Sequence, residues 1–429
     1  MTKATQLADQ LTEKTVLGEW FQPMDRALDK VRFQDKKFTS LPMRAFTLFG
    51  CLRQVQSIPS VREMIQSLFH INEHAIQPPI SRSTLCDAYA SNCRRDILIE
   101  AVNQLIKQAQ GRLPDKLAGV EGLGERAVIA TDATYQAESC HYYPVSPSQG
   151  GVDNKKGHQH LTHFDMRTGI PLMSLIETES MAEIRLLREG GRRGESDCMG
   201  IKAAIHVADR AFIDAAYWDK KKSKLNSTLI TCMKSNLNYA LNKQRSLHQM
   251  DCNQGVVSDY VITLDSSNKP WRLIKFIAPD AEEYLYLSND FDLEPGVIAF
   301  LYHRRWDLEK YFDNFKHDMA NAKAWGKARE AIEQQNFLAI ATYILMRLFI
   351  EKKSNELGMT QGDTTQQKKH LSKQENYVAH NIGIAYHAFY TSLSKVTRQM
   401  WRFLKNCFLK KSALPLYKRQ FKPLVERYL

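Results

Sequence analysis

Four polar residues of the segment YHRRWDLEKYFDNFK, at positions 302–316, have a spacing that suits one face of a helix. On an α-helix with 3.6 residues per turn, they fall within an arc of roughly 60°. They are Tyr302, Arg305, Glu309 and Lys316. A guanidinium and an ammonium beside a carboxylate can hold the phosphates of a nucleic-acid strand at an acidic site. The stripe therefore indicates phosphate chemistry, although the Arg305–Glu309 spacing is also that of an ordinary surface ion pair.

Two aspartates that follow apolar runs are the candidate partners of Glu309. RAVIATDATY, at 126–135, predicts a short strand that ends at Asp132, and IKAAIHVADRAF predicts another that ends at Asp209. Each acid taken singly is more often a cap or an ion-pair partner. Three converging carboxylates would stay ionised together only with hard divalent cations between them. Asp132, Asp209 and Glu309 are thus the predicted catalytic residues and the predicted ligands of two Mg²⁺ or Mn²⁺ ions, which would assist phosphoryl transfer.

The stripe is expected to lie on one continuous helix of four turns. A second side of the helical wheel is apolar, and a third side looks like solvated surface. The apolar side would anchor the helix and hold the polar stripe at the metal ions. The apolar residues are Leu308, Phe312, Phe315 and Met319, and the expected surface residues are His303, Asp307, Asn314 and Asp318.

The two aspartates belong to a segment in which strand and helix periods alternate. The first strand is followed by a predicted hairpin at 160–177, with its turn around Thr168-Gly169. The next predicted elements are a helix at 181–191, the strand that ends at Asp209, a helix at 212–225 and a strand at 227–234. This order predicts an α/β fold with a mixed sheet. In a ribonuclease H-like sheet, the first strand, the fourth strand and a later helix converge at one edge, which would unite the three acids.

Residues 237–294 have a different pattern from the segment before them. Three strand-like runs separated by turn residues, with no helix between them, predict a β-rich insertion. Helical periods flank the α/β part on both sides. The predicted organisation is a helical DNA-binding region at 1–118, the first part of the core at 119–236, the insertion at 237–294, the core helix with the catalytic glutamate at 295–325, and a helical region at 326–429.

Two terminal features have more than one interpretation. QPPISRSTL, followed by a helix, is compatible with a helix-turn-helix in which Arg82, Ser83 and Thr84 face DNA, and equally with a plain helical bundle. A basic helix with interleaved aromatics is predicted at 395–411, after a polar linker at 360–374. This helix suits either contact with nucleic acid or a solvated terminus.

The composition and the net charge indicate what class of molecule the protein could bind. The net charge is +12 and the isoelectric point about 9.2, which favours a polyanion such as nucleic acid, although a basic protein need not have such a partner. The eight cysteines include no C-x-x-C pair, as expected for reduced thiols in the cytoplasm. The polar start of the sequence does not resemble a signal peptide, and no apolar run has the roughly 20 residues of a membrane span.

With these residues in place, the sequence resembles a known family. The pattern Y-x2-R-x3-E-x6-K, matched without a gap at Tyr302, Arg305, Glu309 and Lys316, is similar to the signature of DDE transposases of the insertion-sequence-four family. IATDATY and VADRAF resemble the strands that carry the two aspartates of that family. A β-rich insertion before the glutamate is a further shared trait. The resemblance extends over residues 40–350.

The resemblance implies a cut-and-paste DNA transposase with a ribonuclease H-like core. Such an enzyme binds the terminal inverted repeats of its element and acts as a homodimer that synapses two DNA ends. It works in the prokaryotic cytoplasm, at the nucleoid when bound. In relatives a base flips out and stacks on an aromatic residue. Trp306, a predicted DNA contact, and Trp271, which fits a core residue better, are the candidates for stacking.

One departure from the family and two other functions stay open. Relatives often carry arginine where this chain has Cys232, so a DNA contact there could be weaker or shifted towards Lys234 or Asn236. A ribonuclease H-like nuclease without strand transfer would need the same triad. A transposase-derived DNA-binding protein without activity would not need it, and the complete triad and helix signature argue against that function.

Overall fold

The computed structural model describes residues 13–33, 38, 41–56, 81–137, 157–177, 181–190, 196–278 and 281–356. Within these residues one mixed sheet of nine strands runs through the molecule in the order β3-β2-β1-β4-β5-β9-β8-β7-β6. The strands are β1 Val128–Ala137, β2 Gly157–Asp165, β3 Ile170–Glu177, β4 Ile205–Ala208, β5 Thr228–Cys232, β6 Tyr239–Gln244, β7 Val256–Leu264, β8 Pro270–Ile277 and β9 Glu283–Ser288. Strands β1, β4 and β5 are parallel to one another, and the other neighbours are antiparallel.

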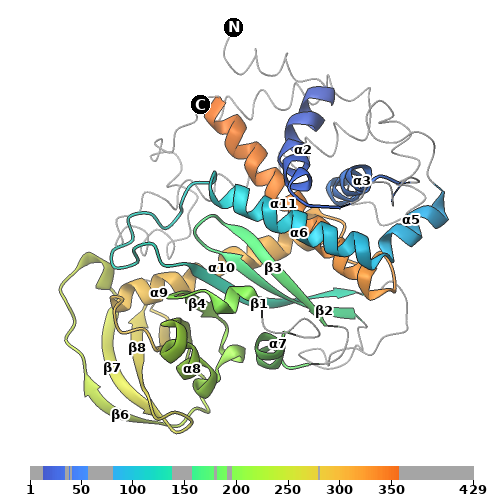
Figure 1. Cartoon of the computed structure of the whole chain (residues 1–429). Coiled ribbons are helices and arrows are strands. Elements are labelled where there is room, and N and C mark those ends of the chain that lie inside the picture. The colour runs from blue at the N-terminus through green and yellow to red at the C-terminus, as the bar shows by residue number, and fades with distance from the viewer. Residues whose placement is uncertain are drawn as a thin grey trace.

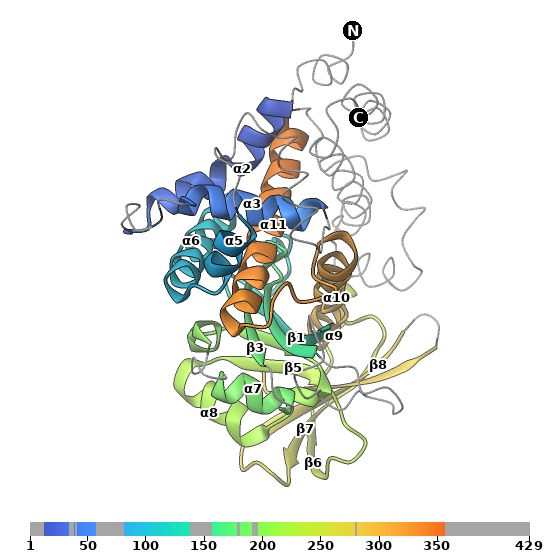
Figure 2. The ribbon, with the colours of Figure 1, turned by 90° about the vertical axis from the view of Figure 1, so that its right-hand side faces the viewer.

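Helices cover both faces of the central strands (Figures 1 and 2). The helices are α2 Glu13–Asp29, α3 Met43–Gln56, α5 Arg82–Tyr89, α6 Asn92–Gln110, α7 Glu183–Glu189, α8 Ala215–Leu225, α9 Pro295–His303, α10 Trp306–Asp313 and α11 Arg329–Glu356, with short turns η3 Asp197–Gly200, η4 Arg210–Phe212, η5 Asp251–Asn253 and the π-helical η6 Asn314–Asp318. Successive side chains of a strand point to opposite faces of the sheet. The side chains on one face pack with α9 and α10, and those on the other face pack with α7 and α8.

The predicted order of strands and helices in the α/β part is confirmed. The hairpin of β2 and β3 turns at Gly169, whose positive φ of 69° suits glycine. Thr168 and the backbone of Arg167 both bond to the carboxylate of Asp165, which fixes the turn. The expected end of the first strand is wrong, because β1 continues five residues past Asp132 in its pairing with β2.

The β-rich segment extends the central sheet instead of forming a sheet of its own. β9 pairs with β5 in the core and with β8 in the insertion, so the hydrogen bonding is continuous from one part to the other. β6, β7 and β8 lie at the far end of the molecule from α2 and α3 (Figure 1). Trp271 of β8 is fully buried and donates to Asp219 of α8 at 3.1 Å, as expected for a core residue.

The N-terminal helices and α11 share one hydrophobic core (Figure 2). Gly50 of α3 allows close contact with α11, because a Cβ there would lie 2.3 Å from Leu338. The guanidinium of the buried Arg53 lies 3.7 Å from the ring centre of Trp325, which joins α3 to the segment after α10. Among the described helices, none combines the length and the apolar character needed to cross a membrane.

The expected helix over 302–316 is not continuous. α9 ends at His303, α10 begins at Trp306, and the segment closes in π-helical η6. Backbone bonds from residue 305 to 302, from 307 to 304 and from 308 to 305 tighten the junction. Leu308, Phe312, Phe315 and Met319 are buried as predicted.

The prediction that Asp307 lies on the solvated side is wrong. Its side chain is only 3% exposed and is paired with the equally buried Arg304 across the junction. The electrostatic neighbours of Lys116, which is also buried, include both of these residues. A buried carboxylate needs such cationic partners, so the junction is held by charges that come partly from another element.

The helix-turn-helix question stays a prediction. α5 and α6 follow each other after a two-residue connection, and Ser81 caps α5 by accepting from the backbone N–H of Thr84 at 3.1 Å. Arg82 and Ser83 are exposed, whereas Thr84 is partly buried. The predicted linker at 360–374 and the predicted basic helix at 395–411 lie outside the described residues.

Candidate active site

β1 and β4 place Asp132 and Asp209 at the same level of the sheet. The last registered pair of these parallel strands is Thr131 with Ala208. Asp132 and Asp209 are the next residues on their strands, so they lie at the same end of the parallel pairing. Asp209 leaves the strand and caps η4 by accepting from the first backbone N–H of that turn.

Arg305 joins the first of these aspartates to the glutamate of α10. Its guanidinium donates to Oδ2 of Asp132 through Nη1 and to Oε1 of Glu309 through Nη2, the latter at 2.9 Å. The three side chains are 12%, 17% and 31% exposed, respectively, so the arrangement is only partly open to water. The structure therefore brings a strand residue and a helix residue, separated by 177 positions in the sequence, to one cation.

The charges of the other two predicted acids act on the carboxyl of Asp132. Burial, with a smaller contribution from the charges of Asp209 and Glu309, raises the pKa of Asp132 to about 6, although Arg305 opposes the change. A protonated carboxyl is favoured where several carboxylates meet in a poorly solvated place. Asp132, Asp209, Glu309 and Arg305 therefore form one electrostatic unit.

A fourth acid, Glu183, adjoins the same unit. Burial raises its pKa to about 7, and the charges of Asp132 and Asp209 contribute to the increase. Sequence reasoning missed it because it occupies the first turn of α7, which is the usual place for an acidic residue on any helix. Only the packing of α7 near the β4–η4 corner distinguishes Glu183 from an ordinary helix-end acid.

Tyr302 lies beside Arg305, and its side chain packs against other side chains of the protein. Its ring is 5.7 Å from the guanidinium carbon of Arg305 and 5.3 Å from the ring of Tyr286 on β9. Burial raises the pKa of Tyr302, as does the hydrogen bond that its hydroxyl donates to Cys232. Cys232, which stands where relatives often have arginine, thus accepts a hydrogen bond from the phenol at the edge of the site.

Lys316 and Trp306 occupy two further positions around α10. Lys316, in η6, is half-buried, and burial lowers its pKa against the opposing charge of Asp313. The ammonium also lowers the pKa of His160 on β2, which places it along the sheet from Asp132. Trp306 is 56% exposed. The structure therefore groups Tyr302 and Arg305 with the acids and leaves Lys316 and Trp306 at the margins.

Comparison with known proteins identifies the family. Residues 125–345, more than half of the chain, match the family model described as the transposase DDE domain. The chain belongs to this family of DDE transposases. The matched residues include all three acids and end within α11.

Two individual proteins are also similar to this DDE transposase chain. A probable transposase for insertion sequence element IS5377 from Geobacillus stearothermophilus is 23% identical over 179 residues. The alignment covers 41% of this chain and 46% of the relative, so it spans about half the length of that protein. A cryo-EM structure of a piggyBac transposase synaptic complex with hairpin DNA superimposes with a TM-score of 0.39 and 11% identity, covering 87% of this chain and 85% of the other.

The donor set suits hard divalent cations. Carboxylate oxygens are the preferred ligands of Mg²⁺ and Mn²⁺, and the charges of Asp209 and Glu309 both act on the carboxyl of Asp132. In the described part of the transposase, no group of three acidic, histidine or cysteine side chains is close enough together to enclose a metal ion. Arg305 holds oxygens of two of the acids instead.

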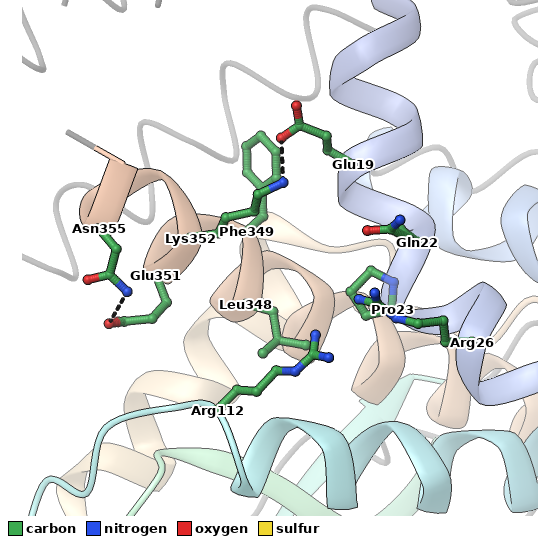
Figure 3. A pocket seen from close by; sticks show the side chains of 10 residues that line it. All are labelled: Glu19, Gln22, Pro23, Arg26, Arg112, Leu348, Phe349, Glu351, Lys352 and Asn355. Carbon is green, nitrogen blue, oxygen red and sulfur yellow. Dashed lines mark hydrogen bonds and ion pairs between the residues drawn. The ribbon is translucent and has the colours of Figure 1, made fainter. Parts of the chain in front are cut away.

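A cavity of about 240 Å³ lies elsewhere, between α2 and α11 near the end of α6 (Figure 3). An ion pair of 3.1 Å between Lys352 and Glu19 joins the two helices beside it. The guanidiniums of Arg26 and Arg112 line it as well. None of its lining residues belongs to β1, β4 or α10, so this cavity is not part of the transposase site.

Proposed function

We propose that this chain is a DNA transposase that binds the terminal inverted repeats of an insertion sequence and catalyses metal-dependent DNA cleavage and strand transfer. The observation that carries the proposal is that Arg305 bridges Asp132 and Glu309 at the end of the parallel strands where Asp209 also lies. Membership of the DDE transposase family supports the same function. The net charge of +12 suits a polyanionic substrate.

The proposed catalytic core is ribonuclease H-like. Its support is the strand order β3-β2-β1-β4-β5, with three antiparallel strands followed by two parallel ones, and a later helix that brings the glutamate to β1. The core would comprise residues 119–236 and 295–325, interrupted by the insertion at 237–294. The helical regions at 1–118 and 326–429 would flank it, with the first of them binding DNA.

In the proposed reaction, Asp132, Asp209 and Glu309 would hold two Mg²⁺ or Mn²⁺ ions. When bound, such ions stabilise the charge that develops on the attacking and leaving oxygens of a phosphodiester. Glu309 sits on a helix whose apolar face is buried, so its carboxylate is held at a fixed position relative to β1. The chain's own contribution is thus to fix three oxygen donors at one end of a rigid sheet.

The residues around the acids would hold the DNA strand. Arg305 offers a planar fork for a phosphate, and Lys316 offers a point charge farther along the strand. The burial of Tyr302 suggests that it acts mainly by supporting Arg305. Trp306, which is exposed beside Arg305, would stack on a base. Two copies of the chain would synapse the two ends of the element.

A cleavage assay with the ends of the element tests the proposal. Full-length protein, Mg²⁺ and a labelled duplex carrying the inverted repeat should give a nicked product whose 3′-hydroxyl joins a target duplex. Asp132→Asn and Glu309→Gln should each lower the cleavage rate by about a hundredfold or more. The matched controls are Asp265→Asn, in an exposed turn after β7, and Glu189→Gln, on the exposed side of α7. Both variants should cleave DNA at the wild-type rate.

The outcomes separate the candidate functions. Cleavage by Asp132→Asn at the wild-type rate would refute the catalytic assignment. Cleavage without joining to the target would indicate a nuclease instead. Binding should weaken with salt, with a log-log slope of about −0.9 per neutralised phosphate, and a flat response would exclude nucleic acid as the substrate.

A further inference from the structure

Arg305 occupies the oxygens that the proposed metal ions would need. Its two Nη atoms donate to one oxygen of Asp132 and one oxygen of Glu309. Both contacts are charge-assisted, and all three side chains are largely shielded from water. A divalent cation that bound between Asp132 and Glu309 through these two oxygens would have to displace the guanidinium from at least one of them.

The guanidinium of Arg305 can bind a partner other than the two carboxylates. Its Nε is buried and has no hydrogen-bond partner among the described residues, so the pair of carboxylates does not use its full donor capacity. The aromatic ring of Tyr302 lies 5.7 Å from the guanidinium carbon and offers it a second contact besides the acids. A phosphate could engage the fork bidentately in the same way as a carboxylate does.

We propose that Arg305 competes with divalent metal for Asp132 and Glu309, and that a DNA phosphate frees the carboxylates by drawing the guanidinium away. This inference rests on the proposed function and adds a coupling to it. Metal binding is weak while Arg305 holds the acids, and it tightens when DNA is present. By linkage, metal tightens the binding of DNA by the same factor. The transposase thereby assembles its metal site mainly on DNA.

Two simpler roles of Arg305 make different predictions. If Arg305 only bound phosphate, its replacement by lysine, which keeps the positive charge, would leave metal affinity unchanged in the absence of DNA. If it only held the acids in position as a structural ion pair, its removal would let them separate, and metal affinity would fall. Competition predicts tighter metal binding once Arg305 is removed, and it alone predicts tighter binding also for Arg305→Lys, which keeps the positive charge near the acids.

The experiment measures Mn²⁺ binding to the full-length protein without DNA, by the electron paramagnetic resonance signal of free Mn²⁺. Arg305→Gln should bind Mn²⁺ about tenfold more tightly than wild type, within the usual range of coupling between two sites. The matched control is Arg329→Gln. Arg329 also bridges a glutamate four residues on, Glu333 at 3.2 Å, and a strand glutamate, Glu177 at 3.7 Å. Its loss should leave Mn²⁺ binding unchanged.

A second comparison adds DNA. A duplex of the element's end with a phosphorothioate at the cleavage position keeps the negative charge and slows cutting. It should tighten Mn²⁺ binding to wild type and have little effect on Arg305→Gln. If Arg305→Gln does not fold, Arg305→Lys serves instead. Lysine keeps the charge but lacks the planar fork, so this variant should also bind Mn²⁺ more tightly than wild type without DNA.

The results distinguish this inference from the proposed function. Unchanged or weaker Mn²⁺ binding by the Arg305 variants would overturn the competition, even where Asp132→Asn and Glu309→Gln abolish cleavage and the proposed function stands. Unchanged Mn²⁺ binding by Asp132→Asn and Glu309→Gln would remove the metal site itself, and both proposals would fall together.

Discussion

Replacement of Arg272 by methionine should be among the most destabilising single changes in the insertion. Arg272 of β8 is fully buried and binds Asp259 of β7 with two contacts of 2.7 and 3.2 Å. Its remaining Nη atom donates to the backbone carbonyls of Asp290 and Leu293, each at 2.7 Å. These carbonyls belong to the connection between β9 and α9, so Arg272 joins the insertion to the helix that leads into the site.

The expected magnitude follows from the burial of both partners. Asp259 is 2% exposed, and Arg272→Met would leave its carboxylate with only Arg245 at 3.1 Å. Removing one member of a buried ion pair costs about 3–5 kcal/mol, because the other charge stays desolvated. The double variant Arg272→Met with Asp259→Leu removes both charges, and it should recover most of that loss.

A matched control separates burial from charge. Arg245 also contacts Asp259, but its side chain is 33% exposed, so Arg245→Met should cost only about 0–1 kcal/mol. Urea denaturation followed by tryptophan fluorescence gives the free energies of unfolding, with the buried Trp271 beside Arg272 as a local reporter. The reasoning is refuted if Arg272→Met costs no more than Arg245→Met, or if the double variant is less stable than the single one.

Two further predictions concern pH and have opposite signs. Burial lowers the pKa of His206 to about 3, so the neutral imidazole contributes fully to folding stability above the unfolded pKa of about 6.5, and this stability is lost as pH falls. His206→Phe should therefore reduce the loss of folding stability between pH 7 and pH 5 by about 2 kcal/mol. Burial raises the pKa of Glu183 to about 7, so folding stability is lost as pH rises from the unfolded pKa of 4.5 towards 7. Glu183→Gln should reduce that loss by roughly 1–2 kcal/mol, a value discounted because the side chain is partly exposed. Urea unfolding at pH 5, 7 and 8 measures both, and parallel pH profiles of variant and wild type would contradict either prediction.

The order of elements around Asp132 and Asp209 could be predicted from the sequence because local patterns encode it. The strands that carry them are continuous apolar runs, and the helices between them have a clear helical period. The register of β1 with β4, which pairs Thr131 with Ala208, then brings the two acids level, and no local pattern of the sequence encodes that register. Their closeness to Glu309 depended on the resemblance to a family, and the electrostatics of Asp132 support it.

Other features depend on tertiary contacts that no local pattern reveals. All six residues of β6 are exposed, so the strand has no alternation of buried and exposed positions and was missed. The junction at Arg304 contains neither proline nor glycine, and its sequence is compatible with an unbroken helix. The feature found at the interruption is the buried pair of Arg304 and Asp307, with Lys116, a residue almost 200 positions earlier, as an electrostatic neighbour.

The junction also changes what the polar stripe can do. On one straight helix, Tyr302, Arg305, Glu309 and Lys316 would face a single phosphodiester as equivalent contacts. With the break before α10 and the wider turn of η6, Arg305 and Glu309 meet Asp132, whereas Lys316 lies beside His160 on the neighbouring strand. Arg305 and Glu309 thus lie at the acid of β1, whereas Lys316 lies farther along the sheet, where the proposed function has it hold the DNA strand at a distance from the acids.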